Sequence, residues 1–238
     1  MSTVTPATRY KNHRFPTELI SHAVWLYFRF CLSFRDVEEL LLERGVVVTY
    51  EAIRKWCRTC GQQYANPLRR RRPRSRDKWH LDEVFLTIKG EHHYLWRAID
   101  QDGNVLVILV QRRRDKTAAK KCFRKLLNGV SYVPRVIVTD KLKSYGAAKR
   151  ELLPGGEHRQ HRSLNTRAEN SHHPTRQRER RLQRVKSPGQ AQRFLSAHGP
   201  IVQHFRPRRH RLSAPTSRYE MRKRFQSWWA ITTPALAA

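Results

Sequence analysis

The sequence predicts an α/β domain preceded by an all-α helical domain. Three observations support this fold class. Residues 1–65 carry apolar side chains at helical spacing, between signals for helix starts and helix ends. Three strand-like runs then follow one another closely between residues 79 and 110. A helix-like segment and a short apolar run at residues 136–139 come next, so the last strand can lie parallel to the first.

The charge of the chain points to a polyanionic partner. Its 238 residues include 49 Lys or Arg against 19 Asp or Glu, a net charge of +30. Apolar residues make up 39% and six are Trp, so a packed core is expected. Nucleic acid is the first candidate partner, and an anionic membrane surface is the second. The longest apolar run, residues 105–110, is far short of the roughly 20 residues of a membrane span.

The remaining composition argues against several classes. A charge of this size disfavours an acidic partner or a metabolic enzyme. Four Cys are too few for a disulfide scaffold, and no secretory signal is visible at the start of the chain. We therefore expect a protein of the reducing cytoplasm with no membrane association.

Composition divides the chain into four parts. We expect a helix-turn-helix DNA-binding domain at residues 1–65 and an Arg-rich linker at 66–77. Residues 78–205 form the predicted α/β domain, and residues 206–238 form a basic tail. The linker is predicted because residues 69–76 hold six Arg in eight positions, which repel one another and bind phosphate.

The N-terminal part predicts two or three helices. Pro16 can open the first, with apolar residues on one face at Leu19, Ala23, Leu26 and Phe30. Ser33 and Asp36 have the spacing of a capping box for the second, which we expect to stop at Gly45.

Thr49 can cap a further helix from Tyr50 to Cys60 that ends at Gly61. This helix exposes Arg54, Lys55 and Arg58. A helix, a tight turn and a basic helix are typical of a helix-turn-helix, whose second helix enters a major groove. The alternative is a helical hairpin that packs on its neighbour without binding DNA.

The second part begins with strands. In residues 79–88, Asp82 shares one pleat face with Val84, Leu86 and Ile88. Residues 94–99 predict a second strand and 105–110 a third, joined by a hairpin turn at 100–104 that contains Asp-Gly. Asp115 can cap the helix that follows, Asn128 and Gly129 stop it, and the strand at 136–139 ends on Asp140.

Asp82 and Asp140 are placed where a carboxylate is costly unless it is paired or binds a cation. If the first and fourth strands are neighbours, the two side chains converge on one site. Mg²⁺ suits such oxygen ligands, and two ions about 4 Å apart can cleave a phosphodiester. The alternatives are a salt bridge to Arg for Asp82 and a helix cap for Asp140. A third carboxylate is normally required, and spacing leaves open the candidates Glu151, Glu157, Glu169 and Glu179.

Several ordered motifs together resemble the DDE transposases, most closely the insertion-sequence-six group of bacterial elements. They are Trp79-His80-Leu81-Asp82-Glu83, Val138-Thr139-Asp140-Lys141 with Ser144-Tyr145-Gly146, Glu157-His158-Arg159-Gln160, Arg167-Ala168-Glu169-Asn170-Ser171-His172 and the stretch from Ala191 to His198. The resemblance covers most of the chain, including the helical part.

The resemblance implies a catalytic core that is RNase H-like, as in retroviral integrases. It maps the catalytic and metal-binding triad onto Asp82, Asp140 and Glu169, with Glu179 in reserve, and implies Mg²⁺, with Mn²⁺ as a possible substitute. A basic residue seven positions after the glutamate corresponds to Arg176. We expect DNA contacts from the basic helix, the linker and the segments around the triad: Arg54, Lys55, Arg58, Arg69, Arg70, Arg71, Arg72, Lys141 and Arg176.

The implied function is replicative transposition. The enzyme would bind the terminal inverted repeats of its element, nick the 3′ ends and join them to target DNA. It would act as a homodimer or larger homo-oligomer in the bacterial cytoplasm, at the nucleoid. Two alternatives stay open: a non-catalytic helix-turn-helix protein or inactive transposase relic, and an RNase-H-type nuclease that cuts without joining.

Overall fold

A computed structural model of the chain describes residues 14–71, 77–129, 132–160, 165, 168, 185–207 and 212–233. It contains two compact units. A helical unit combines the residues up to Arg71 with those from Ser196 onward, and a sheet unit comprises Arg72–Leu195. Within the described ranges, no helix combines the length and the apolar character that crossing a membrane requires.

The helical unit is built around aromatic side chains. Its elements are α2 (Thr17–Arg29), α3 (Phe34–Leu42), α4 (Tyr50–Arg70), the end of α9 (Pro188–His204) and α10 (Ala214–Thr232). Trp228 of α10 is buried, with its ring centroid 5.2 Å from that of Tyr64 and 5.5 Å from that of Phe205. The residues expected to form a basic tail therefore include a helix that packs into this core.

The predicted starts of α3 and α4 are confirmed. The Ser33 hydroxyl accepts the Asp36 N–H at 3.0 Å, and the Asp36 carboxylate accepts the Ser33 N–H at 2.8 Å, which is a capping box. Thr49 accepts the Ala52 N–H at 3.3 Å and caps α4. After α3, Gly45 adopts φ +74°, a conformation that favours glycine and reverses the chain.

The predicted apolar face of α2 is wrong. Leu19 and Leu26 are half-buried and Phe30 is exposed, whereas the buried side of the helix carries Ile20, Ser21, Ala23, Val24, Tyr27 and Phe28. The helix is rotated so that Tyr27 and Phe28, two of its three bulky aromatic residues, are buried in place of the leucines. Only Ala23 belongs to both sets.

The predicted end of α4 at Gly61 is also wrong, since the helix continues to Arg70 and includes residues 66–70 of the expected linker. Gly61 is buried where a Cβ atom would lie 2.8 Å from the Phe28 ring. The absence of a side chain lets α2 approach α4 closely. Gly61 is therefore a packing residue in the middle of a helix instead of a stop signal.

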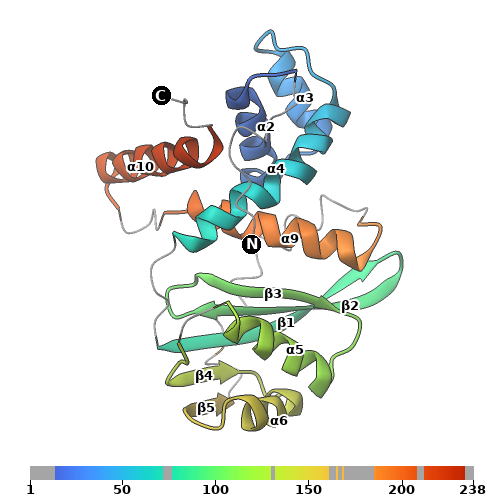
Figure 1. The fold of residues 1–238 in the computed structure, drawn as a ribbon, viewed down its shortest axis with the longest axis vertical. Coiled ribbons are helices and arrows are strands. Elements are labelled where there is room, and N and C mark those ends of the chain that lie inside the picture. The colour runs from blue at the N-terminus through green and yellow to red at the C-terminus, as the bar shows by residue number, and fades with distance from the viewer. Residues whose placement is uncertain are drawn as a thin grey trace. The chain divides into compact units, whose positions relative to one another are not determined.

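The described residues of the sheet unit form a five-stranded sheet in the order β3-β2-β1-β4-β5. They are β1 (Lys78–Ile88), β2 (Glu91–Asp100), β3 (Val105–Gln111), β4 (Val136–Thr139) and β5 (Glu157–Gln160) (Figure 1). The first three form an antiparallel meander, and β4 pairs in parallel with β1 and with β5. The predicted meander and the parallel fourth strand are confirmed, whereas β5 was not predicted.

Helices cover both faces of this sheet. On one face, α5 (Lys116–Leu127) and α6 (Lys143–Leu152) bury a cluster that includes Trp79, Leu81 and Trp96. On the other face, Ala191 and Leu195 of α9 pack in a cluster with apolar residues of β1, β2 and β3. The Asp115 side chain accepts the Ala118 N–H at 2.8 Å, which confirms the predicted cap of α5.

Replacing Gly61 by Ala makes a new methyl group overlap the buried Phe28 ring, which costs about 1–3 kcal/mol. Helix propensity returns about 1 kcal/mol, so the helical unit is expected to lose up to about 2 kcal/mol of stability. Urea unfolding measures the difference. Gly155→Ala is the matched control, because a Cβ atom there meets nothing within 4 Å. A Gly61→Ala variant as stable as wild type would contradict the close packing.

Candidate active site

The parallel pairing of β1 with β4 creates the site. Lys78, Trp79 and His80 pair with Val136, Ile137 and Val138. The carboxyl end of β4 therefore lies beside the middle of β1, and Asp140 follows β4 directly. One carboxylate oxygen from each of Asp82, Glu83 and Asp140 lies within 4.8 Å of the other two.

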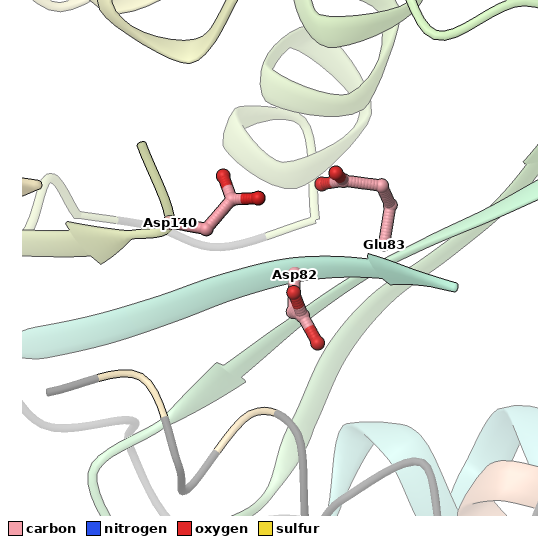
Figure 2. A group of neighbouring side chains, drawn as sticks. All are labelled: Asp82, Glu83 and Asp140. Atoms are coloured by element: carbon pink, nitrogen blue, oxygen red, sulfur yellow. The ribbon is translucent and has the colours of Figure 1, made fainter. Parts of the chain in front are cut away.

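The three carboxylates reach this point from different directions (Figure 2). Glu83 shares its pleat face with Trp79 and Leu81, which pack against α5 and α6. Asp82 shares the opposite face with Val84 and is 8% exposed. In Figure 2 the Glu83 and Asp140 side chains turn toward each other, and Asp82 extends from the other side of β1.

Glu83 is held by two hydrogen bonds and has a side chain that is only 2% exposed. The Tyr145 hydroxyl donates to Oε2 at 2.6 Å, and Nε of Arg114 donates to Oε1 at 2.6 Å. Burial raises the pKa of the Glu83 carboxyl above its ordinary value, and the hydrogen bond from Tyr145 opposes that rise. The nearby Asp140 charge raises the Glu83 pKa further, whereas Arg114 lowers it.

Arg114 joins Glu83 to Asp140. Its Nη2 atom ion-pairs with Glu83 and lies 3.2 Å from Oδ2 of Asp140. The other oxygen of Asp140, Oδ1, accepts the Leu142 N–H at 3.0 Å, just ahead of α6. This contact lies in the turn before α6, whose N-cap is Leu142 and has no side-chain cap hydrogen bond, so the capping alternative considered for Asp140 is wrong.

The backbone at Asp140 is also held in place. The buried Thr139 hydroxyl donates to the Asp140 carbonyl at 2.8 Å and lies 3.0 Å from Nε2 of His158 on β5. Burial lowers the pKa of His158, and the charge of Lys149 lowers it further. The fifth strand therefore supports the residue that ends the fourth.

The chemistry of this cluster fits a divalent cation. It supplies three carboxylates, which are hard oxygen ligands of the kind that Mg²⁺ and Mn²⁺ prefer. Across the ranges that the structure describes, it is the only set of three or more His, Cys, Asp or Glu side chains close enough to hold a metal ion.

Asp82 and Asp140 are brought together as predicted, whereas Glu83 and Arg114 were not predicted as site residues. The signal for Glu83 was available, since two consecutive carboxylates in an apolar strand place one acid on each face. No comparable signal marks Arg114. Glu169, Glu179, Arg72 and Arg176 lie outside the described residues.

The basic residues predicted on α4 lie on its surface. Arg54, Lys55 and Arg58 are exposed, and Nη2 of Arg54 lies 2.7 Å from Glu51. Arg70 and Lys141 are also exposed. Arg69 and Arg71 of the predicted linker cluster are exposed as well, and each makes one contact within its own unit: Arg69 donates to the Ser196 carbonyl at 3.3 Å and Arg71 to the Ser227 carbonyl at 3.4 Å.

The strand order and the acidic cluster at the β1–β4 junction define an RNase H-like domain. Residues 76–208 match the protein family described as "DDE domain". The chain belongs to the DDE transposases of the insertion-sequence-six family.

Two curated relatives come from Staphylococcus aureus. The transposase for insertion sequence-like element IS431mec, of strain Mu50, is 34% identical over 149 residues, which cover 61% of this chain and 63% of that protein. The transposase for insertion sequence element IS257 in transposon Tn4003 is 33% identical over the same length. The matched region thus spans somewhat less than two thirds of these relatives.

Two solved structures have weaker similarity. The HTLV-2 integrase catalytic core domain in complex with magnesium has a TM-score of 0.40 at 13% identity and covers 57% of this chain and 88% of that one. A simian T-cell lymphotropic virus intasome in complex with PP2A regulatory subunit B56 gamma has a TM-score of 0.41 at 13% identity. The match covers 84% of this chain and 72% of that one.

His158 is expected to make the protein sensitive to acid. Because its pKa is below 6.5 in the folded state, the unfolded chain binds the proton more readily. The stabilising contribution is therefore present above pH 6.5 and is lost as the pH falls through the folded pKa. Urea unfolding between pH 7.5 and 5 should show a smaller loss for His158→Gln than for wild type. Exposed His92, changed to Gln, is the control, and equal losses for His158→Gln and wild type would contradict the prediction.

Proposed function

We propose that the protein is a transposase that binds the terminal inverted repeats of its element, nicks the 3′ ends and joins them to target DNA. The observation that carries this proposal is the convergence of Asp82 and Asp140 at the β1–β4 junction. A pure DNA-binding protein has no need of two carboxylates at that junction, where burial makes them costly. Family membership supports the same reaction class.

Glu169 is the third carboxylate in this proposal. It directly follows Ala168, which is buried in the apolar cluster on the Asp82 face of the sheet. Nearby, Nδ2 of buried Asn165 donates to the Leu81 carbonyl at 2.8 Å, beside Asp82. Consecutive Cα atoms are about 3.8 Å apart, so the proposal puts the Glu169 carboxylate near this face. Arg176 would hold a DNA phosphate close by.

Asp82, Asp140 and Glu169 would hold Mg²⁺, with Mn²⁺ as a substitute. When bound, the metal activates a water or 3′-hydroxyl and stabilises the leaving oxygen at phosphorus. The protein contributes position: the Leu142 N–H orients Asp140, and the Thr139 hydroxyl fixes its backbone. Glu83 would act as a positioning residue, because both of its oxygens are engaged by Tyr145 and Arg114.

In this proposal each of the four parts of the chain has its own role. Residues 1–65 would bind the inverted repeats through Arg54, Lys55 and Arg58. The Arg-rich linker at 66–77 and the basic tail at 206–238 would hold phosphates, and residues 78–205 would carry out catalysis. Joining two element ends requires at least two protomers, so a homodimer or larger homo-oligomer in the bacterial cytoplasm, at the nucleoid, is part of the proposal.

The competing function is a non-catalytic DNA-binding protein, including an inactive transposase relic. The exposed basic residues of α4 and the net charge of +30 fit it equally well. The acidic cluster favours the enzyme, because a binder would gain nothing from like charges gathered within 4.8 Å.

Asp82→Asn, Asp140→Asn and Glu169→Gln are each expected to lower Mg²⁺-dependent cleavage of terminal-repeat DNA by about 10³-fold or more, because each removes a metal ligand. DNA affinity should stay close to that of wild type. Cleavage and joining are measured on labelled repeat DNA. Asp77→Asn is the control, since that carboxylate pairs with Arg135 on the surface.

The three variants separate the functions. Cleavage that survives both Asp82→Asn and Asp140→Asn would exclude the proposed active site. Cleavage by wild type without joined products would identify a nuclease of the RNase-H type. Specific repeat binding by a wild-type protein that never cleaves would support the non-catalytic alternative.

Arg54→Ala, Lys55→Ala and Arg58→Ala are expected to weaken binding to the inverted repeats. Each phosphate contact that is lost should reduce the slope of log affinity against log salt by about 1, and each lost base contact should cost about 1–3 kcal/mol. Fluorescence anisotropy at several salt concentrations measures both. Arg135→Ala is the matched control, because this exposed cation pairs with Asp77 in the sheet unit and is not among the proposed DNA contacts. Binding unchanged in all three variants would support the packing hairpin instead.

A further inference from the structure

We propose that Arg114 is an internal counter-cation of the active site, which holds Asp140 in the metal-free protein and releases it when a divalent metal binds. This inference rests on the proposed metal site at Asp82 and Asp140. It adds a regulatory element to that site, because metal binding becomes an exchange of one cation for another.

The geometry places the guanidinium where a cation is needed. Arg114 donates from Nε to Glu83 and contacts Oδ2 of Asp140 with Nη2 at 3.2 Å. Both contacts are charge-assisted, and the planar fork of Arg matches two carboxylates better than a point charge does.

A metal and Arg114 compete for the same atom. Oδ1 of Asp140 already accepts the Leu142 N–H, so Oδ2 is the oxygen left for a cation. Arg114 is its partner in the described structure. A divalent ion bound to Oδ2 would place a second cation beside the guanidinium, and the repulsion between the two charges would favour release of the arginine from Asp140.

The ion pairs of Arg114 with Glu83 and with Asp140 differ in strength. At Glu83 the ion pair is buried, with the carboxylate 2% exposed, whereas Asp140 is 26% exposed and Arg114 is 37% exposed. Solvent weakens the Asp140 contact more than the Glu83 contact. Metal binding should thus break the ion pair between Arg114 and Asp140, while the ion pair with Glu83 persists.

The backbone of Arg114 is well placed for such a movement. It directly precedes Asp115, whose side chain caps α5 by accepting the Ala118 N–H at 2.8 Å. The helix start is therefore fixed, and the change is confined to a long, half-exposed side chain. The N–H group that had paired with Asp140 would then be available to a DNA phosphate, while Glu83 keeps the rest of the guanidinium in place.

Mn²⁺ titration of the full chain without DNA tests the exchange. Calorimetry gives the dissociation constant for wild type, Arg114→Gln and Arg114→Lys. Arg114→Gln should bind Mn²⁺ about two- to fivefold more tightly, the scale of one partly exposed ion pair. Arg114→Lys keeps the charge and should stay within about twofold of wild type. Arg112→Gln is the matched control, because Arg112 is 78% exposed and lies 3.9 Å from the exposed carboxylate of Glu91, outside the acidic cluster.

A second measurement uses only the wild-type protein, in case Arg114→Gln does not fold. Phenylglyoxal modifies accessible arginines, and peptide mass spectrometry reports each site. Mn²⁺ should increase the modification rate of Arg114 at least about twofold, which is the lower end of the change in Mn²⁺ affinity expected for Arg114→Gln. The modification rate of Arg112 should stay unchanged.

The outcomes separate this inference from the proposed function. If Asp140→Asn does not weaken Mn²⁺ binding to the chain, the metal site is wrong and the inference falls with it. If Asp140→Asn weakens binding but Arg114→Gln binds Mn²⁺ equally or less tightly, the metal site stands and the counter-cation role is excluded. Protection of Arg114 from phenylglyoxal by Mn²⁺ would exclude it as well.

Discussion

The parallel pairing of β1 with β4 is the contact on which the site depends. Three residue pairs bring the end of β4 beside the middle of β1, across more than 50 residues of chain. Two antiparallel strands and α5 lie between them in sequence, and α5 packs against the same face that β1 and β4 present. Because the crossover buries its own apolar residues, the pairing is stabilised by the core and does not depend on the carboxylates. The sheet that positions the acids therefore does not need them in order to fold.

Hydrogen bonds from neighbouring residues offset the desolvation and the repulsion that oppose the gathering of these acids. Within 4.8 Å the structure assembles three carboxylates, and burial disfavours the charged form of Glu83. Tyr145, Arg114 and the Leu142 N–H each supply a hydrogen bond to one of the acids. Two separate elements contribute to one small site: the loop before α5 through Arg114, and the first turn of α6 through Leu142 and Tyr145. The arrangement explains why an acidic site persists in a chain with 30 more cations than anions.

Local patterns were enough to predict β1, β2, β3, α5 and β4, because each has a strong strand or helix signal and a recognisable cap or turn. The convergence of Asp82 and Asp140 followed from topology alone. The extent of α4 did not, since a helix signal cannot reveal that Gly61 faces the Phe28 ring. The short strand β5, with four polar residues, has no apolar pattern to recognise. Arg114 could not be predicted for a different reason. Its distance from Glu83 along the chain does not distinguish it from the many other arginines that could pair with Glu83.

The position of Arg114 also affects how copies of this chain behave toward one another. On a surface dominated by arginine and lysine, an uncompensated acidic cluster would be the strongest attractor for the arginines of a second molecule. Such contacts would link copies head to tail, without closed symmetry, and favour open-ended assembly. With Arg114 already seated between Glu83 and Asp140, that attraction is satisfied inside the molecule. We infer that the same residue reduces the attraction of this site for the arginines of a second copy, most of all at low ionic strength, where exposed charges act over the longest distances.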